Sequence, residues 1–324
     1  MVLLLPMKTK NIVALIFSGL LIASCQEKKP EFEKIVLTIN NQRIEILTAF
    51  KLFDNYLEKS KTNTNIIRAS KRLVYDPVKK EIISNAEAAF LFNTIKVPYK
   101  PNEYLKAETD ALKSIDLISI IKEVLIKVTS ELPGPDTKII ILPASEYLRQ
   151  TFEKNNLPLS GLTIGTGKII LMIDPTFENW TDFLPYAIAH EYHHSTWISR
   201  NWVSSDFSLI EYLIFEARAD MFASDLYGNM NNPLTKILSK QQESQVWRLI
   251  ENEIFEKGHA KINKVMFGDD MIPFGSGYTI GFNIVKHYKQ KNPTISNLDL
   301  IDRDAKLIFE QSGYTDYLTE KNNN

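Results

Sequence analysis

Residues 186–196 read YAIAHEYHHST and place three of the five histidines of this 324-residue chain within five positions. His190, Glu191 and His194 satisfy the pattern H-E-x-x-H. On a helix, positions four apart lie on one face, so the two histidines can direct imidazole nitrogens at one Zn²⁺ ion. Glu191 projects beside them and can reach a metal-bound water without ligating the metal. The stretch therefore predicts a helix with one zinc ion per chain.

The residues before the motif favour that helix. Thr181 and Asp182 suit its N-terminus, Pro185 falls in its first turn, and residues 186–189 contain no helix breaker. His193 faces away from the pair of predicted ligands, so we expect it to support the site rather than bind the metal.

A second predicted helix, over residues 208–225, carries the carboxylates that complete the site. Glu216 and Asp220 are four positions apart and share one face. We expect Glu216 to be the third zinc ligand and Asp220 to accept the far ring N–H of a ligand histidine. Glu211 is the competing third ligand, ranked second because no carboxylate follows it at the same spacing. In the alternative interpretation, Glu216 and Asp220 merely flank Arg218 on a solvated face.

Three segments together resemble a known bacterial family. The segments are AHEYHH (189–194), FEARAD (215–220) and GSGYTIG (275–281). They are similar to a family of predicted zinc-dependent proteases, catalogued as a domain of unknown function, within the gluzincin or thermolysin-like clan. The similarity runs from about residue 115 to 315 and includes the strand predicted over 168–173.

This resemblance implies an α+β fold, a gluzincin-like metallopeptidase domain in which a small β-sheet packs on the H-E-x-x-H helix and the remainder is mainly helical. The family commonly has Glu-Gly-Leu-Ala-Glu in the second segment, where this chain has Glu-Ala-Arg-Ala-Asp. The carboxylates persist, so the proposed ligand Glu216 is retained, while Arg218 adds a charge.

The implied chemistry is peptide hydrolysis by a zinc-bound water that Glu191 activates and whose proton Glu191 returns to the leaving amine. Tyr278, in a glycine-rich turn, is the candidate second donor to the oxyanion, with a packing role as the alternative. His259 and His287 compete for that donor role. We expect residues 168–173 to be the edge strand that pairs with an extended substrate, in a cleft between the sheet and the later helices.

The N-terminal residues predict a targeting signal rather than part of the folded domain. Residues 1–24 resemble a lipoprotein signal peptide, because two lysines precede an apolar run that is too short to span a bilayer. The run ends in Ile-Ala-Ser before Cys25, which resembles a lipobox and marks Cys25 for lipidation. Residues 25–34 would then be the lipidated cysteine and a charged tether. A plain cleaved signal with an incidental cysteine is the alternative.

A lipid anchor at Cys25 implies a place in the bacterial cell envelope. Because Gln26 rather than aspartate follows the cysteine, proteobacterial sorting favours the outer membrane or cell surface.

The rest of the chain divides into two predicted regions. Residues 35–114 form a mainly helical N-terminal region that opens with a strand hairpin broken at Asn40-Asn41. Residues 115–320 form the metallopeptidase domain, in which 138–142 and 168–173 are apolar strands. A loop that bears Gly161, Gly165 and Gly167 is expected between them.

The composition of the chain gives no support for nucleic-acid binding and indicates a globular protein. The 38 Lys+Arg and 39 Asp+Glu give a formal net charge of -1, so no basic excess supports nucleic-acid binding. With 44% hydrophobic residues the chain is globular, and its single cysteine excludes an intrachain disulfide. Three functions remain compatible with the sequence. The first is a membrane-anchored zinc endopeptidase or aminopeptidase acting on a peptide or protein. The alternatives are a catalytically silent scaffold lipoprotein and a zinc hydrolase of a non-peptide or cell-wall amide substrate.

Overall fold

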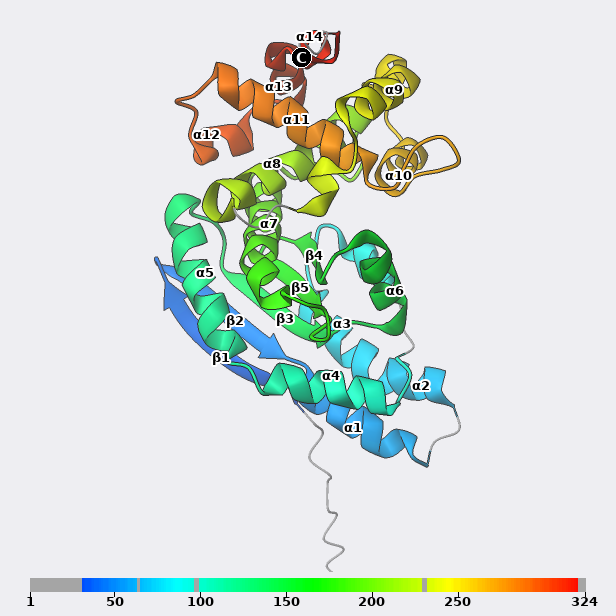
Figure 1. The fold of residues 1–324 in the computed structure, drawn as a ribbon. Helices are drawn as coiled ribbons and strands as arrows, with labels where there is room; N and C mark the ends of the chain where they lie inside the picture. The colour runs from blue at the N-terminus through cyan, green and yellow to red at the C-terminus, as the bar shows by residue number, and fades with distance from the viewer. Residues whose placement is uncertain (1–30, 63–64, 96–98, 229–231, 320–324) are drawn as a thin grey trace, which may run out of the picture. The chain divides into compact units, whose positions relative to one another are not determined.

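The computed structural model describes residues 31–62, 65–95, 99–228 and 232–319, which belong to one compact unit that begins at Glu31 (Figure 1). The predicted signal peptide, Cys25 and most of the 25–34 tether lie outside the described residues. Within the described ranges, no helix is long and apolar enough to cross a bilayer.

Among the described residues, five strands form one mixed sheet in the order β1-β2-β3-β5-β4. They are β1 (Glu33–Ile39), β2 (Gln42–Thr48), β3 (Thr137–Pro143), β4 (Leu159–Gly165) and β5 (Lys168–Ile173). β2, β3 and β5 are parallel, while β1 and β4 run antiparallel to their neighbours at the two edges. The predicted hairpin is confirmed, because Asn40 and Asn41 join β1 to β2 with positive φ angles of 48° and 66°.

The prediction that residues 168–173 form the edge strand is wrong. β5 lies between β3 and β4, and β4 is the edge strand. Gly161 and Gly165 accordingly belong to a strand rather than to a loop, and only Thr166 and Gly167 form the turn. The physical reason is visible in the composition: β5 is an almost continuous apolar run, which is typical of a strand covered on both faces, whereas β4 mixes small, polar and apolar residues.

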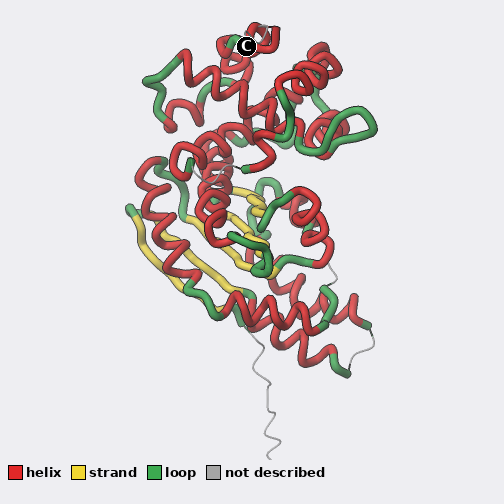
Figure 2. Tube along the Cα trace, in the orientation of Figure 1, coloured by secondary structure: helices red, strands yellow, loops and turns green. Residues whose placement is uncertain are grey.

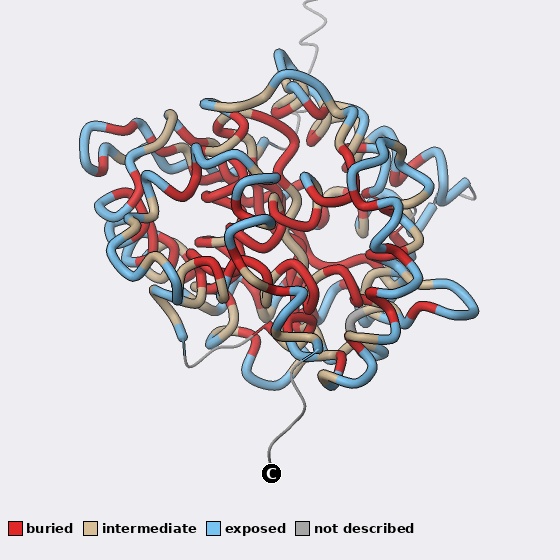
Figure 3. Tube along the Cα trace, turned by 90° about the horizontal axis from the view of Figure 1, so that it is seen from above, coloured by how far each residue is buried: buried red, intermediate tan, exposed pale blue. Residues whose placement is uncertain are grey.

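Helices cover both faces of the sheet, as the arrangement of strands and helices in Figure 2 illustrates. Alternate side chains of β3 pack in opposite directions: Ile139 and Ile141 join a core with α5 (Leu117–Glu131) and α7 (Trp180–Asn201), and Ile140 and Leu142 join a core with α1 (Phe50–Ser60). Figure 3 shows buried residues gathered in the middle of the unit and exposed residues at its rim. The predicted α+β class, with a small sheet and a mainly helical remainder, is confirmed.

A second core lies among the later helices, around α8 (Leu209–Tyr227) and α11 (Ser276–Lys291). The other α-helices are α2 (Ile66–Ser70), α3 (Asp76–Ile82), α4 (Glu103–Lys113), α6 (Glu146–Asn155), α9 (Lys240–Ile250), α10 (His259–Phe267), α12 (Asn297–Asp302), α13 (Ala305–Ser312) and α14 (Tyr314–Thr319). Short turns of 3₁₀ or π-helix are η1 (Lys71–Tyr75), η2 (Ala89–Thr94), η3 (Pro233–Lys236) and η4 (Glu251–Glu253).

The motif helix α7 begins one residue earlier than the sequence predicts, at Trp180, after Asn179 with a φ of 61°. Pro185 therefore lies inside the helix rather than in its first turn. Because proline has no N–H, the carbonyl four residues before it loses its helical partner. The helix nevertheless continues through the motif, since its central residues are buried on the sheet side and on the α8 side.

Helix α8 lies between α7 and α11, and glycine makes its contact with α11 close. A Cβ at Gly281 would stand 2.4 Å from the carbonyl oxygen of Leu213 on α8, which is a backbone atom that cannot move aside. A Cβ at Gly277 would stand 2.9 Å from the Leu213 side chain. The glycines of the GSGYTIG segment therefore set the distance between the two helices.

Replacing Gly281 by alanine should destabilise the fold. Alanine gains about 1 kcal/mol of helix propensity over glycine, but overpacking a tight helix contact costs about 1–3 kcal/mol, so we expect a net loss in the free energy of unfolding. Urea unfolding followed by circular dichroism measures it. Lys286→Ala, on the exposed face of α11, is the matched control. Equal or higher stability of Gly281→Ala would contradict the close contact.

Candidate metal centre

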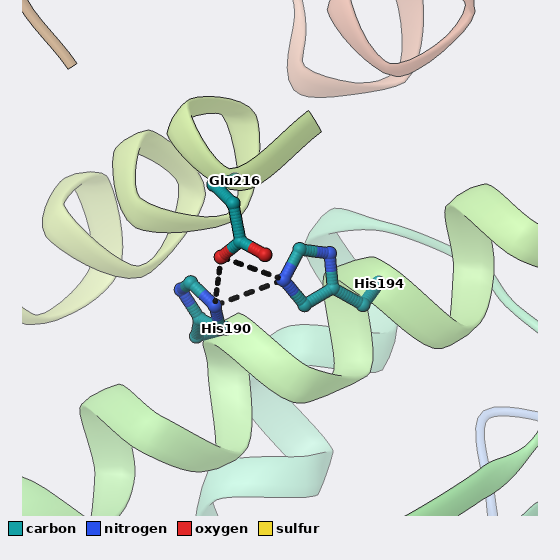
Figure 4. Close-up of side chains that lie close together, drawn as sticks. All are labelled: His190, His194 and Glu216. Atoms are coloured by element: carbon teal, nitrogen blue, oxygen red, sulfur yellow. Dashed lines mark hydrogen bonds and ion pairs between the residues drawn. The ribbon is translucent and has the colours of Figure 1, made fainter. Parts of the chain in front are cut away.

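Helices α7 and α8 lie side by side and bring three ligand-type side chains to one point (Figure 4). His190 Nε2 and His194 Nε2 are 2.9 Å apart. Each of these nitrogens lies 3.5 Å from Glu216 Oε2. This is the group among the described residues whose donor atoms could hold a metal ion.

The donors fit zinc in kind and in spacing. Two imidazole nitrogens and one carboxylate oxygen form a ligand set typical of catalytic zinc sites. Ligands at about 2.0–2.2 Å from a tetrahedral ion stand about 3.3–3.5 Å from one another. The two 3.5 Å distances to Glu216 Oε2 match this spacing, and the 2.9 Å between the histidine nitrogens is shorter. Two ring nitrogens aimed at each other can share at most one proton, whereas a cation between them satisfies both.

Asp220 lies on the far side of His190 and is completely buried. Its Oδ1 is 3.0 Å from His190 Nδ1, and the same oxygen accepts hydrogen bonds from Tyr186 Oη at 2.9 Å and Asn232 Nδ2 at 3.1 Å. A protonated Nδ1 leaves Nε2 free to bind a metal. Tyr186 and Asn232 are not among the residues that the sequence predicts for the site, because each reaches Asp220 only through the tertiary fold.

The histidines and carboxylates of the centre shift one another's pKa values. Burial alone would raise the pKa of Glu216, but the neighbouring His194 and His190 outweigh it and lower that pKa. Burial alone would lower the pKa of His190, but Asp220 and Glu216 raise it well above its usual value. The centre therefore holds two buried carboxylates that favour a positive charge between them, which is the electrostatic requirement of a cation site.

Glu191 is buried against the edge strand β4. Thr163 Oγ1 lies 2.7 Å from Glu191 Oε2 and 2.9 Å from the Glu191 carbonyl oxygen, within donating distance of both. Two residues earlier, a Cβ on Gly161 would stand 2.2 Å from Glu191 Cγ. Thr163 and Gly161 therefore shape the strand around the carboxylate. The missed signal was strand periodicity, which puts residues 161 and 163 on one face.

Glu211, the competing third ligand, lies elsewhere. Its Oε2 accepts hydrogen bonds of 2.7 Å from the backbone N–H and the hydroxyl of Ser208, which form a capping box at the start of α8. The spacing Ser-x-x-Glu at 208–211 already carries this signature, and the capping interaction explains why Glu211 points away from the centre.

The alternative interpretation of a solvated Glu216/Asp220 face is wrong, because this face of α8 is buried. Arg218 is buried too and donates hydrogen bonds to the carbonyl oxygens of Ile301, at 3.1 Å, and Arg303. These carbonyls belong to the C-terminal end of α12, where a cation is favourable. Arg218 thus fastens α12 to α8 rather than serving the metal centre.

His193 turns away from the centre and packs against Phe222, with ring centroids 5.7 Å apart. Burial, together with the charges of His194 and Arg218, lowers the pKa of His193 well below its usual value. A neutral imidazole in this position belongs to the helix packing between α7 and α8.

Two tyrosines approach the centre from the side of the later helices. Tyr212 precedes Glu216 by four positions on α8, and burial together with the Glu216 carboxylate raises the pKa of Tyr212. Tyr278, in the first turn of α11, is half-buried, and burial followed by the charge of Glu216 raises its pKa. The competing donors lie away from the cavity beside the centre: His259 packs on Phe90 and His287 on Tyr317.

A cavity of about 640 Å³ opens beside His190 and Glu191. Its walls are α6, the start of β4, α7, and the segments that carry Asn232, Phe267 and Tyr278. Aromatic and aliphatic side chains dominate the lining, namely Tyr147, Leu148, Leu157, Leu159, Phe183, Tyr186, Leu234, Phe267, Phe274 and Tyr278. Polar side chains of α6, among them Gln150, Lys154 and Asn155, also line the cavity. A cleft that combines apolar walls with convergent polar groups is the usual form of a binding site.

Comparison with known families gives one match. Residues 117–310 match the family described as "Predicted Zn-dependent protease (DUF2268)". The matched range contains both histidines, Glu191, Glu216 and Tyr278, and it agrees with the range of the resemblance seen in the sequence. No curated protein and no solved structure gives a significant match.

Removing Glu216 should weaken zinc binding, whereas removing Glu211 should not. We expect Glu216→Ala to lower zinc affinity about 100-fold or more, because it removes a ligand while loss of a supporting partner alone typically costs 10–100-fold. Glu211→Ala should keep zinc affinity and lose about 1 kcal/mol of stability with its cap. Competition with a chromophoric chelator measures affinity. Weaker binding in Glu211→Ala alone would move the third ligand to Glu211.

Proposed function

The chain belongs to the family of predicted zinc-dependent proteases, and from its metal centre we propose that it hydrolyses peptide bonds. One observation carries the proposal: His190, His194 and Glu216 converge within a few ångströms while Glu191 borders the same cavity without joining them. A general base beside a ligand set, rather than within it, is the arrangement that metal-assisted hydrolysis requires.

Zinc held by these three side chains would acidify water and polarise the carbonyl of the substrate. Glu191 accepts the proton of the attacking water and returns it to the leaving amine. Thr163 holds one carboxylate oxygen of Glu191 at 2.7 Å, which leaves the other oxygen for proton transfer. Asp220 keeps the proton of His190 on Nδ1, so that Nε2 remains a ligand.

The choice between the two tyrosines follows from their partners. Tyr212 lies one helical turn before the ligand Glu216 on α8, and the carboxylate of Glu216 raises its pKa, so we assign Tyr212 to supporting that carboxylate. Tyr278 lines the cavity together with His190 and Glu191. A phenol kept neutral by burial can donate to a developing oxyanion, and we assign this role to Tyr278.

An extended substrate would pair with β4. Pro158 O accepts a hydrogen bond from Asp174 N at the start of the β4–β5 ladder. Because hydrogen-bonded positions alternate along an antiparallel pair, Leu159, Gly161 and Thr163 direct their N–H and C=O groups away from β5. Strand addition at this edge places a peptide along the wall that holds Glu191. A motif helix beside an edge strand, with the third ligand on the next helix, also supports the gluzincin resemblance.

The lipid anchor at Cys25 remains part of the proposal. Glu33, where β1 begins, is eight positions after Cys25, and a fully extended chain of that length spans at most about 26–29 Å. The catalytic unit would therefore work close to a membrane of the bacterial envelope, on peptides or proteins at that surface. The complete set of donors and the presence of Glu191 argue against a silent scaffold.

Glu191→Gln should retain zinc and lose turnover. Glutamine keeps the size of the side chain but cannot accept the proton, so we expect the rate of peptide cleavage to fall about 10²- to 10⁴-fold. Metal analysis and cleavage of a peptide library, with and without chelator, provide the measurement. Glu211→Gln, on the same pair of helices, is the control. Full activity of Glu191→Gln would refute the mechanism.

Thr163→Val should lower kcat and leave KM and zinc affinity near their original values, because valine has the shape of threonine without its hydroxyl. A hydrogen bond to a carboxylate contributes about 1.5–3 kcal/mol, so kcat should fall about 10- to 100-fold. Thr163→Ser restores the hydroxyl and should recover most of the rate. A serine variant no better than valine would mean that Thr163 acts through packing alone.

A further inference from the structure

We propose that the substrate cleft is closed at one end, next to Glu191, and that the enzyme therefore removes one or two residues from the N-terminus of a peptide. This rests on the proposed peptidase function and deepens it, since the metal centre alone is compatible with both internal and terminal cleavage. The closure is made by the segment of residues 85–90, which precedes and enters η2.

Backbone contact closes the C-terminal end of the edge strand. Ala88 N donates a 3.0 Å hydrogen bond to Ile164 O, so this carbonyl of β4 already has the partner that a substrate strand would supply. The backbone N–H and C=O groups of Leu159, Gly161 and Thr163, which precede this point, are directed away from β5. The start of β4, from Leu159 to Gly161, lines the cavity, whereas the Ile164 carbonyl near its end already has a partner.

Side chains fasten the closing segment to the strand and its turn. Glu87 accepts hydrogen bonds from Thr166 N at 2.9 Å and Thr166 Oγ1 at 2.7 Å. Lys168 Nζ donates to Asn85 O at 2.6 Å. A Cβ on Gly165 would stand 2.3 Å from Glu87 Oε2 and 3.0 Å from Glu87 N, so the segment lies directly against β4. No space for a peptide remains between them.

The same segment also contacts the opposite wall. The ring of Phe90 lies 6.4 Å from the ring of His259, at the start of α10. Helix α10 ends at Phe267, which lines the cavity. Phe90 is 48% exposed, so its ring spans between two parts of the molecule rather than filling a core. This ring contact links the closing segment to the start of α10, outside the cavity lining.

The shape of the cavity agrees with closure at one end. On β4 the lining consists of Leu159, Ser160 and Gly161, and it continues from there toward Leu157 and α6. Glu191 and His190 stand at the Gly161 end. Because an extended peptide advances about 3.3 Å per residue and the occupied Ile164 carbonyl follows Thr163 directly, only one or two substrate residues fit beyond Glu191 on that side.

Strand direction identifies the terminus that meets the closed end. Peptide addition to a sheet edge is slightly more stable when antiparallel. A peptide antiparallel to β4 has its N-terminus at the Ile164 end and its C-terminus toward Leu159. The closed end therefore limits the residues before the scissile bond, and the open cleft along α6 receives those after it.

The test uses one apolar peptide sequence in three forms: free, N-acetylated and C-amidated, with the zinc-loaded full-length protein. We expect the free and C-amidated forms to lose one or two N-terminal residues, and N-acetyl peptides extended by several residues to be cleaved at least 100-fold more slowly. Mass spectrometry identifies the bond. Internal cleavage of the N-acetylated form at a similar rate, or a block by C-amidation instead, would overturn the inference and leave the peptidase function standing.

A variant that opens the closed end provides the second arm. Glu87→Ala/Phe90→Ala removes the Thr166 anchor and the His259 contact, and should gain at least 10-fold in cleavage of the N-acetylated peptide while retaining zinc and activity on the free form. Phe255→Ala, an exposed phenylalanine that packs on Phe309, is the control. Unchanged selectivity in the double variant, with normal folding, would count against closure by this segment.

Peptide binding by the inactive variant tests closure of the cleft independently of catalysis. Zinc-loaded Glu191→Gln should bind the free peptide at least 10-fold more tightly than the N-acetylated form in isothermal titration calorimetry. Equal binding of both would overturn closure. Absence of cleavage and of binding for every form, with zinc present, would instead overturn the proposed function together with this inference.

Discussion

Two buried carboxylates facing two histidines are the constraint on which the rest of this structure depends. Asp220 is completely buried and Glu216 nearly so, and isolated buried charges are too costly to persist without partners. His190 and His194 supply those partners only if α7 and α8 keep one separation and one rotation. The long packed contact between these helices, and the fastening of α12 to α8 by Arg218, follow from holding that geometry.

The edge strand β4 positions Glu191 and borders the proposed substrate path. β4 lies against Glu191, with glycine where the side chain needs room and threonine where the carboxylate needs a donor. Its far end is held by residues from the N-terminal region, through the Ala88–Ile164 bond and the Glu87–Thr166 bonds. The region that precedes the family match, at residues 31–116, thereby contributes two strands to the sheet and the segment that borders the substrate path.

The later helices complete the other side by close approach. Gly277 and Gly281 let α11 contact α8, and this contact carries Tyr278 to the cavity. The GSGYTIG segment thus combines packing and placement: its glycines set the helix distance and its tyrosine enters the site. Bulkier residues at these positions would push α11 outward and withdraw the phenol.

Periodicity in the sequence determined the two helices and the set of residues on their shared faces, because positions four apart must lie together on any α-helix. Hence His190, His194, Glu216 and Asp220 could be named, and the Asn40-Asn41 hairpin as well. The edge strand was predicted wrongly, although the almost continuous apolar run of β5 and the mixed composition of β4 indicate which of the two is covered on both faces. Asn232 was beyond the sequence, because only the tertiary fold brings it to Asp220. Gly161 and Thr163 share one strand, and Tyr212 precedes Glu216 by four positions on α8. Periodicity places these residues on common faces, but their approach to the centre depends on the tertiary structure. For Glu211 the sequence did contain the deciding signal. The spacing Ser-x-x-Glu at 208–211 indicates a capping box, although Glu211 was also considered as a metal ligand. Local spacing determined which side chains share one helix face. The tertiary structure decided which residues of other elements contact that face, because contacts between distant segments depend on burial and shape that no single segment encodes.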